Sequence, residues 1–219
     1  MSTPARDNSP APDARGGDDF SMIFATPLVI RDWPDSDTLN TELAGLIAAA
    51  QMAVPGVGKS NVGGWHSPPD FILGEVPALA TLRERIRTVV IELTRRLMAP
   101  GAYHFKIDGW ANILRAGDYN GPHNHPNATW SGVYYLTGVP EPADRQPNAV
   151  PPLAGKIEFF DPRPAAGMVY AAESMLQRRC LFTPRPGCML VFPSWLQHMV
   201  HPHDGAGERH SIAFNVTVG

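Results

Sequence analysis

Two histidines, His123 and His125, stand two positions apart in the stretch GPHNHPNATWSGVYYL (residues 121–136). Side chains alternate between the two faces of an extended segment, so both imidazoles are expected on the same face. A neutral imidazole offers one nitrogen lone pair, and two of them on one face can bind a single divalent metal ion. The pair is therefore a candidate arm of a metal site.

A second cluster of histidines follows in residues 186–216. The apolar run CMLVF predicts a buried strand, and PSWLQH after it predicts a tight excursion that returns His198 toward the first pair. Arg209 stands eleven residues further on, inside another strand-like run. This layout favours one joint site over separate histidines in exposed loops. His201 and His203, in a loop expected to be wet, receive no role.

The chain that must position these residues shows two kinds of sequence pattern, a helical one in its first half and a β-rich one in its second half. Apolar residues recur every three or four positions in 38–53 and 76–98, which predicts two amphipathic helices. From about residue 103 short β-rich runs alternate with Gly, Pro, Asn and Asp, which predicts an all-β sandwich or barrel covered on one side by the helices. The predicted strands are 103–115, 130–137, 155–160, 167–171, 178–183, 187–192 and 209–218, with an earlier one in 20–33.

The predicted organisation is a disordered tail over 1–19 and a single domain over 20–219, with helical support at about 35–98 and the barrel core at about 103–219. Two loops, 54–70 and 138–155, are the predicted lids over a site.

Composition narrows the class of protein. The 219 residues carry a formal charge of −3, which gives no large basic field for nucleic acid. No apolar run approaches the roughly 20 residues that span a bilayer, and the N-terminus lacks the layout of a signal peptide. The two cysteines are interpreted as reduced thiols. We therefore expect a cytoplasmic protein without nucleic-acid or membrane partners, and the sequence leaves a homodimer open.

Five stretches resemble the iron(II)- and 2-oxoglutarate-dependent oxygenases, in particular an uncharacterised family related to prolyl and aspartyl hydroxylases. They are GWANILRAGDYNGPHNHP, SGVYYL, GKIEFFDPR, PGCMLVFPSWLQHMV and ERHSIAFNV, within 109–219. The resemblance implies a double-stranded β-helix, a jelly-roll of the cupin-like kind, with N-terminal helices packed on one sheet. It also implies Fe(II), 2-oxoglutarate as co-substrate, O2, and hydroxylation of an unknown small molecule or protein side chain.

Carried over by position, the resemblance makes His123 the first metal ligand, His198 the distal ligand and Arg209 the clamp for the far carboxylate of 2-oxoglutarate. The planar guanidinium fork suits a carboxylate because it can donate two parallel hydrogen bonds. Tyr134, Ser211 and Asn112 are further candidates for binding the co-substrate.

The sequence departs from the family pattern at His125, which stands where these enzymes carry Asp or Glu. Three accounts remain open. His125 is itself the third ligand; or water fills the position while His125 only lines the pocket; or a carboxylate from elsewhere completes the site, with Asp118, Glu158 and Asp161 as candidates. The alternative functions are a cupin-like three-histidine metalloenzyme that does not use 2-oxoglutarate, and a non-catalytic metal-binding β-barrel.

Overall fold

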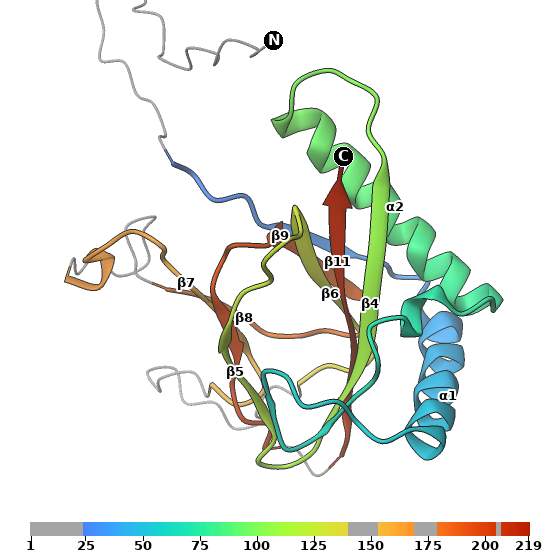
Figure 1. Ribbon diagram of the computed structural model, residues 1–219. Helices are drawn as coiled ribbons and strands as arrows, with labels where there is room; N and C mark the ends of the chain where they lie inside the picture. The colour runs from blue at the N-terminus through green and yellow to red at the C-terminus, as the bar shows by residue number, and fades with distance from the viewer. Residues whose placement is uncertain (1–23, 140–152, 169–178, 205–206) are drawn as a thin grey trace, which may run out of the picture.

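The computed structural model describes residues 24–139, 153–168, 179–204 and 207–219, and the predicted tail over 1–19 lies outside these ranges. Figure 1 shows two helices beside a sandwich of β-strands. The helices are α1 (Asp37–Ala53) and α2 (Pro77–Leu97), close to the predicted bounds. Pro77 opens α2, where its fixed φ suits the first helical turn and its missing N–H costs nothing.

A six-stranded antiparallel sheet carries the helices. In spatial order it contains β1 (Val29–Asp32), β9 (Cys188–Pro193), β6 (Trp130–Tyr135), β11 (Arg209–Val218), β4 (Phe105–Leu114) and β3 (Trp65–His66). The buried side chains of both helices form one core with those of the sheet face that they cover, including Tyr134, Ile212 and Phe214. The helices therefore cover one face of this sheet and leave its other face for the second sheet.

The second sheet has five strands. In spatial order these are β2 (Asn61–Val62), β5 (Tyr119–His123), β10 (His198–Val200), β7 (Ile157–Phe160) and β8 (Arg179–Phe182). A second apolar cluster fills the space between the sheets, with Tyr135, Phe159 and Phe192 among its members. Two antiparallel sheets with flanking helices confirm the predicted jelly-roll class.

Several local predictions differ from the structure. Within the described residues 24–33 only Val29–Asp32 pairs as a strand. The first two residues of the strand predicted over 167–171 belong to a short 3-10 helix, Ala166–Met168, and 169–171 lie outside the described residues. Strands β5 and β10 were not predicted, because β5 contains Gly and Pro and β10 has only three residues. Strands β1, β2 and β3 precede residue 103, so the earlier part of the chain also contributes to both sheets.

No helix in the described part of the chain has the length and apolar character needed to cross a membrane.

Candidate active site

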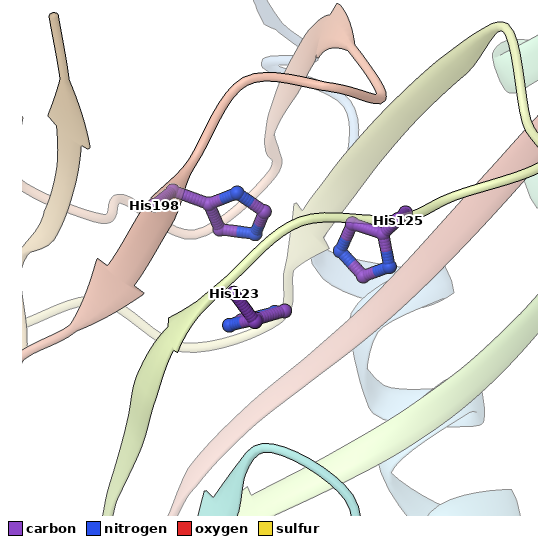
Figure 2. A group of neighbouring side chains, drawn as sticks. All are labelled: His123, His125 and His198. Atoms are coloured by element: carbon purple, nitrogen blue, oxygen red, sulfur yellow. The ribbon is translucent and has the colours of Figure 1, made fainter. Parts of the chain in front are cut away.

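The three predicted histidine ligands come together between the two sheets, as Figure 2 shows. His123 ends β5 and His198 begins β10, and the two residues are direct partners across this strand pair. His125 follows β5 by two residues. One nitrogen from each ring lies within 4.8 Å of those from the other two, and the ring centroids of His123 and His198 are 4.3 Å apart. Strand pairing thus joins residues that are 75 positions apart in the sequence.

Backbone carbonyls orient two of the three rings. The Nδ1 of His123 lies 2.7 Å from Gly121 O, and the Nδ1 of His198 lies 2.9 Å from Leu196 O. A carbonyl oxygen can only accept, so each Nδ1 carries the hydrogen and donates it. The lone pair is then on Nε2, which is the nitrogen available to a metal ion.

Burial keeps the three imidazoles neutral. It lowers the pKa of His198 to about 3 and that of His125 to about 4, with the nearby His123 contributing in both cases. The pKa of His123 is lowered as well, again by burial. At neutral pH all three rings therefore offer a lone pair, which a metal-binding imidazole needs.

These pKa shifts predict that the metal-free protein loses stability in acid. Near pH 5 an unfolded histidine is mostly protonated, whereas His125 and His198 in the fold are mostly neutral. The unfolded chain then binds about two more protons, so the free energy of unfolding falls by about 2.7 kcal/mol per pH unit from these residues as pH decreases. Urea denaturation between pH 7 and pH 4.5 measures this slope. We expect His125→Leu to remove about half of it, and an unchanged slope would contradict the assignment.

No carboxylate of the described residues joins this group of ligand atoms. The three candidates have other partners: Asp118 accepts from the Arg115 backbone N–H at 2.8 Å, Glu158 lies 2.6 Å from His201 Nε2, and Asp161 pairs with Arg163. The account in which one of these carboxylates completes the site is not supported by the structure.

The histidines line a cavity that also contains Arg209. Its other lining residues include the predicted Asn112 and Ser211, and also Ser60, Trp110, Asn120, Tyr135 and Phe192. None of the described residues that line the cavity is acidic. The cavity thus presents neutral imidazoles, amides, hydroxyls and one guanidinium, a combination suited to an anionic ligand.

Arg209 is the strongest electrostatic feature of this cavity. Its side chain is 2% exposed, and its Nε and Nη1 have no hydrogen-bond partner among the described residues. Burial lowers the pKa of Arg209, yet a guanidinium stays protonated in proteins. A buried charge without a partner is costly, and such groups are normally paired. An anionic ligand bound in the cavity would supply the partner that this buried charge needs.

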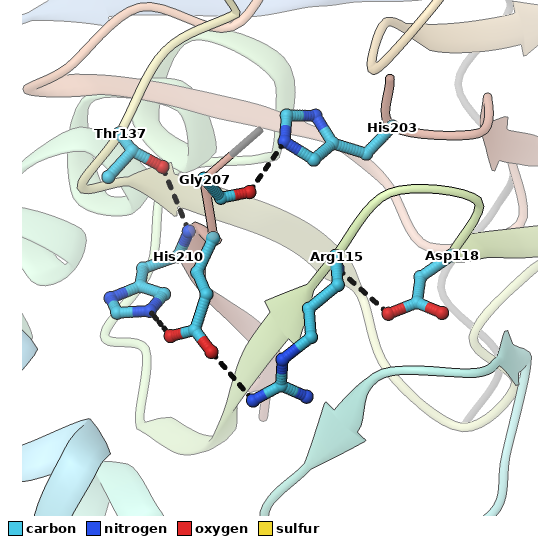
Figure 3. Close-up of polar contacts among 7 residues, drawn as sticks. Arg115, Asp118, Thr137, His203, Gly207 and His210 are labelled. Atoms are coloured by element: carbon cyan, nitrogen blue, oxygen red, sulfur yellow. Dashed lines mark hydrogen bonds and ion pairs between the residues drawn. The ribbon is translucent and has the colours of Figure 1, made fainter. Parts of the chain in front are cut away.

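Polar contacts fix the chain on both sides of Arg209, and Figure 3 shows those made by its neighbour His210 and by Arg115. Glu208 accepts from Arg115 Nη2 at 2.6 Å and lies 3.0 Å from His210 Nε2. The backbone N–H of His210 donates to Thr137 Oγ1 at 2.8 Å. These contacts tie the start of β11 to the end of β4 and to the segment after β6, so Arg209 enters the cavity from a fixed backbone.

The same region corrects one expectation about the loop after β10. His203 was expected to be exposed, but it is buried, and its Nε2 lies 3.1 Å from Gly207 O. The loop is packed against the barrel because the backbone N–H of Gly117 donates to His203 O.

The structure corrects the prediction for Tyr134. Tyr134 lies opposite Ile212 and its hydroxyl donates to Asn40 Oδ1 on α1 at 2.7 Å, so it faces the helices and not the cavity. Its neighbour Tyr135 lies opposite Ser211 and lines the cavity. The Tyr135 hydroxyl is buried beside Arg209 and makes no hydrogen bond of normal geometry to a described residue, and the Arg209 Cζ lies 5.2 Å from the Tyr135 ring centroid. Tyr135 is thus the tyrosine available to a ligand.

Trp110, Ser60 and Asn120 are among the other lining residues that were not predicted from the sequence. Trp110 was identifiable, since it lies two positions before Asn112 on the same strand and therefore on the same face. Ser60 and Asn120 carry no such signal. They meet through strand pairing: Ser60 O accepts from the Gly121 backbone N–H, and Asn120 Nδ2 donates to Ser60 Oγ at 3.3 Å.

Comparison with known proteins identifies the family. The model of the family described as "Putative 2OG-Fe(II) oxygenase" matches residues 108–215. This chain belongs to the 2OG-Fe(II) oxygenases. The oxygenase has no match among curated proteins. Family membership favours the 2-oxoglutarate-dependent reaction over both alternatives, the cupin-like enzyme without this co-substrate and the non-catalytic barrel.

Solved structures share the fold of the oxygenase. A prolyl-4-hydroxylase from Pseudomonas putida is 16% identical, with a TM-score of 0.57 and coverage of 87% of this chain and 91% of that one. A viral collagen prolyl hydroxylase from Paramecium Bursaria Chlorella virus-1, in complex with 2OG, is 16% identical, with a TM-score of 0.54 and coverage of 86% and 94%. HygX from Streptomyces hygroscopicus, with nickel and 2-oxoglutarate bound, is 13% identical, with a TM-score of 0.56 and coverage of 88% and 83%.

The cofactors of the family are Fe(II), 2-oxoglutarate and O2, and the residues of this oxygenase fit them. Imidazole nitrogen is a suitable ligand for iron, and three neutral rings meet in one cavity. The buried guanidinium of Arg209 lies in the same cavity, and its Nε and Nη1 have no hydrogen-bond partner in the described parts of the chain, which matches a dicarboxylate co-substrate.

Proposed function

We propose that the protein hydroxylates an organic substrate, with Fe(II) held by His123, His125 and His198 and the far carboxylate of 2-oxoglutarate held by Arg209. The single observation that carries this proposal is the presence, in one cavity, of three neutral imidazoles and a buried guanidinium whose Nε and Nη1 have no hydrogen-bond partner among the described residues. A metal ion and a dianion satisfy both features at once.

We propose that His125 is the third ligand and not merely a lining residue. Its ring centroid lies 5.0 Å from that of His123 and 5.2 Å from that of His198, so its position supports participation in the same group. Three neutral ligands would leave the full double charge of the metal for the oxygens of 2-oxoglutarate, which compensates for the missing acid.

Bound Fe(II) and 2-oxoglutarate supply the oxidative decarboxylation that activates dioxygen and yields succinate and carbon dioxide. The side chains of the protein bind and orient the participants. Arg209, supported by Tyr135 and Ser211, fixes one end of the co-substrate. Phe192, whose ring centroid lies 4.8 Å from that of His198, helps to keep water away from the imidazoles.

Adjacent tyrosines offer a matched pair of variants. We expect Tyr135→Phe to weaken 2-oxoglutarate binding by about 10- to 150-fold, because a hydrogen bond to a charged group contributes about 1.5–3 kcal/mol and about 1.4 kcal/mol corresponds to a factor of ten. Tyr134→Phe removes the hydroxyl that binds Asn40 and should leave this affinity unchanged while lowering the free energy of unfolding by about 1 kcal/mol. Thermal shift titration with 2-oxoglutarate measures both. Equal loss of affinity in the two variants would contradict the placement of Tyr135.

Formation of succinate tests the proposed reaction. Purified protein with Fe(II), 2-oxoglutarate and O2 should produce succinate slowly even without its substrate, and omission of Fe(II) or O2 should stop it. Iron-loaded protein that forms no succinate and does not bind 2-oxoglutarate would refute the proposal.

We also propose that the protein acts in the cytoplasm. Both Cys180 and Cys188 are free thiols, which supports a reducing compartment.

A further inference from the structure

The three imidazoles of the metal group differ in how the protein supports them. The rings of His123 and His198 each donate to a backbone carbonyl, whereas no hydrogen bond joins the His125 ring to another residue in the described parts of the chain. His125 also lies beyond the end of β5, where its backbone N–H donates to Ser194 O at 2.9 Å; this bond holds the main chain but does not orient the ring. A ligand in this position needs another source of order, because metal-binding histidines are usually oriented by a second contact.

Trp110 makes that contact. Its indole lines the cavity, and its ring centroid lies 5.6 Å from that of His125 at an interplanar angle of 39°. The same indole is stacked with His66 at 5.3 Å and 12°. Both distances are within the range at which aromatic rings attract one another. Three aromatic rings from three segments thus form a row in space, in which Trp110 lies between His66 and His125.

The strand that carries Trp110 is firmly held. The Ala111 backbone N–H donates to Ser67 Oγ at 2.9 Å, Ser67 N–H donates to Ala111 O at 3.0 Å, and the Gly109 N–H donates to Pro69 O at 2.8 Å. Across the sheet Trp110 lies opposite Ala213, whose small side chain leaves room for the indole on the cavity side. His66 is buried, and its Nδ1 donates to Ser67 O at 2.6 Å. The backbone and the neighbours of Trp110 are therefore held in place, so its indole can limit the orientations that the His125 ring adopts.

We propose that Trp110 is the positioning residue for His125, holding this imidazole in the metal group by ring contact in place of a hydrogen bond. The inference rests on the proposed function, in which His125 is the third ligand. It follows that Trp110 determines whether three or two protein nitrogens bind the metal. A variant without the indole should therefore have the same two-nitrogen metal site as His125→Ala, although all three histidines are still present.

Co(II) alone is the probe, because its visible absorption reports the number and type of its ligands. We expect Trp110→Met, which fills much of the same volume with a flexible chain, to bind Co(II) about 10- to 100-fold more weakly, the usual effect of losing a contact that orients a ligand. Its Co(II) spectrum should match that of His125→Ala. Trp110→Phe keeps a ring in place and should restore the wild-type spectrum. Trp110→Leu serves in the same way if Trp110→Met does not fold.

A double variant separates positioning from general damage. If Trp110 acts through His125, Trp110→Met should add little further loss of Co(II) affinity to His125→Ala. Trp130→Met is the matched control, because Trp130 is a buried tryptophan of the same sheet whose Nε1 donates to Thr94 of α2, away from the cavity. Its Co(II) affinity and spectrum should equal those of the wild type.

Two results would overturn the inference: a wild-type Co(II) spectrum in Trp110→Met, or full additivity in the double variant. These outcomes are distinct from failure of the proposed function. If His123→Ala does not weaken Co(II) binding, the metal site itself is wrong. If His123→Ala abolishes binding but Trp110→Met matches the wild type, only the role of Trp110 is wrong.

Discussion

His198→Ala is expected to abolish stoichiometric Fe(II) binding and, with it, succinate formation. His198 is 4% exposed and its ring lies next to both other imidazoles, so no other described side chain can replace its nitrogen. Changes to residues that merely orient a ligand reduce metal affinity by about 10- to 100-fold, and loss of the ligand itself should exceed this. Metal analysis after anaerobic reconstitution and desalting gives the stoichiometry.

His104→Ala provides the control for this experiment. His104 is exposed and lies just before β4, outside the cavity, so its removal should leave one Fe(II) per chain. Far-ultraviolet circular dichroism should show that His198→Ala remains folded. Wild-type iron content in folded His198→Ala would refute the three-histidine centre.

Arg209→Met should raise the KM for 2-oxoglutarate by a factor between about 30 and several thousand, and it should leave Fe(II) binding intact. Truncating one member of a buried charge pair costs about 2–5 kcal/mol, and about 1.4 kcal/mol corresponds to a factor of ten. In the absence of 2-oxoglutarate, however, Arg209→Met should stabilise the protein. In the wild type the buried Arg209 charge has no acidic partner among the residues that the structure describes, and methionine replaces it by an apolar chain, so the ligand-free variant should melt at a higher temperature than the wild type.

The two parts of this prediction are read from one set of melting curves. The wild type should gain stability as 2-oxoglutarate is added, whereas Arg209→Met should gain almost none. Arg209→Lys keeps the charge but loses the planar fork, so its affinity should lie between the two. If Arg209→Met keeps the wild-type KM, the co-substrate lies elsewhere and a three-histidine centre without 2-oxoglutarate becomes the better account.

The elements that could be predicted from the sequence are those with a strong local signal. The 3.6-residue apolar period defined α1 and α2 to within one residue at each end. The long strands β4 and β11 were likewise visible, as were the apolar runs of β6 and β9. The pairing that brings His198 opposite His123 was anticipated only in outline, because it depends on contacts between distant segments.

The error at Tyr134 has a clear physical origin. All six residues of β6 are buried, since one face of the strand packs on the helices and the other lines the cavity. A strand that is buried on both faces has no alternation of polar and apolar residues, so the sequence cannot indicate which of two adjacent tyrosines faces the site. Only the register with β11, in which Tyr135 lies opposite Ser211, decides it.

The contact between Trp110 and His66 was also beyond local reasoning. His66 belongs to the two-residue strand β3, whose position is set by pairing with Ile113 and Asn112 of β4. Nothing in the local pattern around His66 predicts this pairing. Residues that support a ligand from a distance are found from packing, whereas ligands and charged clamps are found from residue type and spacing.

The central claim is that one cavity binds both Fe(II) and 2-oxoglutarate. Its most direct test is anaerobic titration of the Fe(II)-loaded protein with 2-oxoglutarate, monitored through the weak visible charge-transfer absorption of the chelate. We predict that the band appears and saturates at one equivalent of 2-oxoglutarate in the wild type. It should be absent in His198→Ala and shifted to far higher concentrations in Arg209→Met. Stoichiometric Fe(II) without any band at millimolar 2-oxoglutarate would contradict the account.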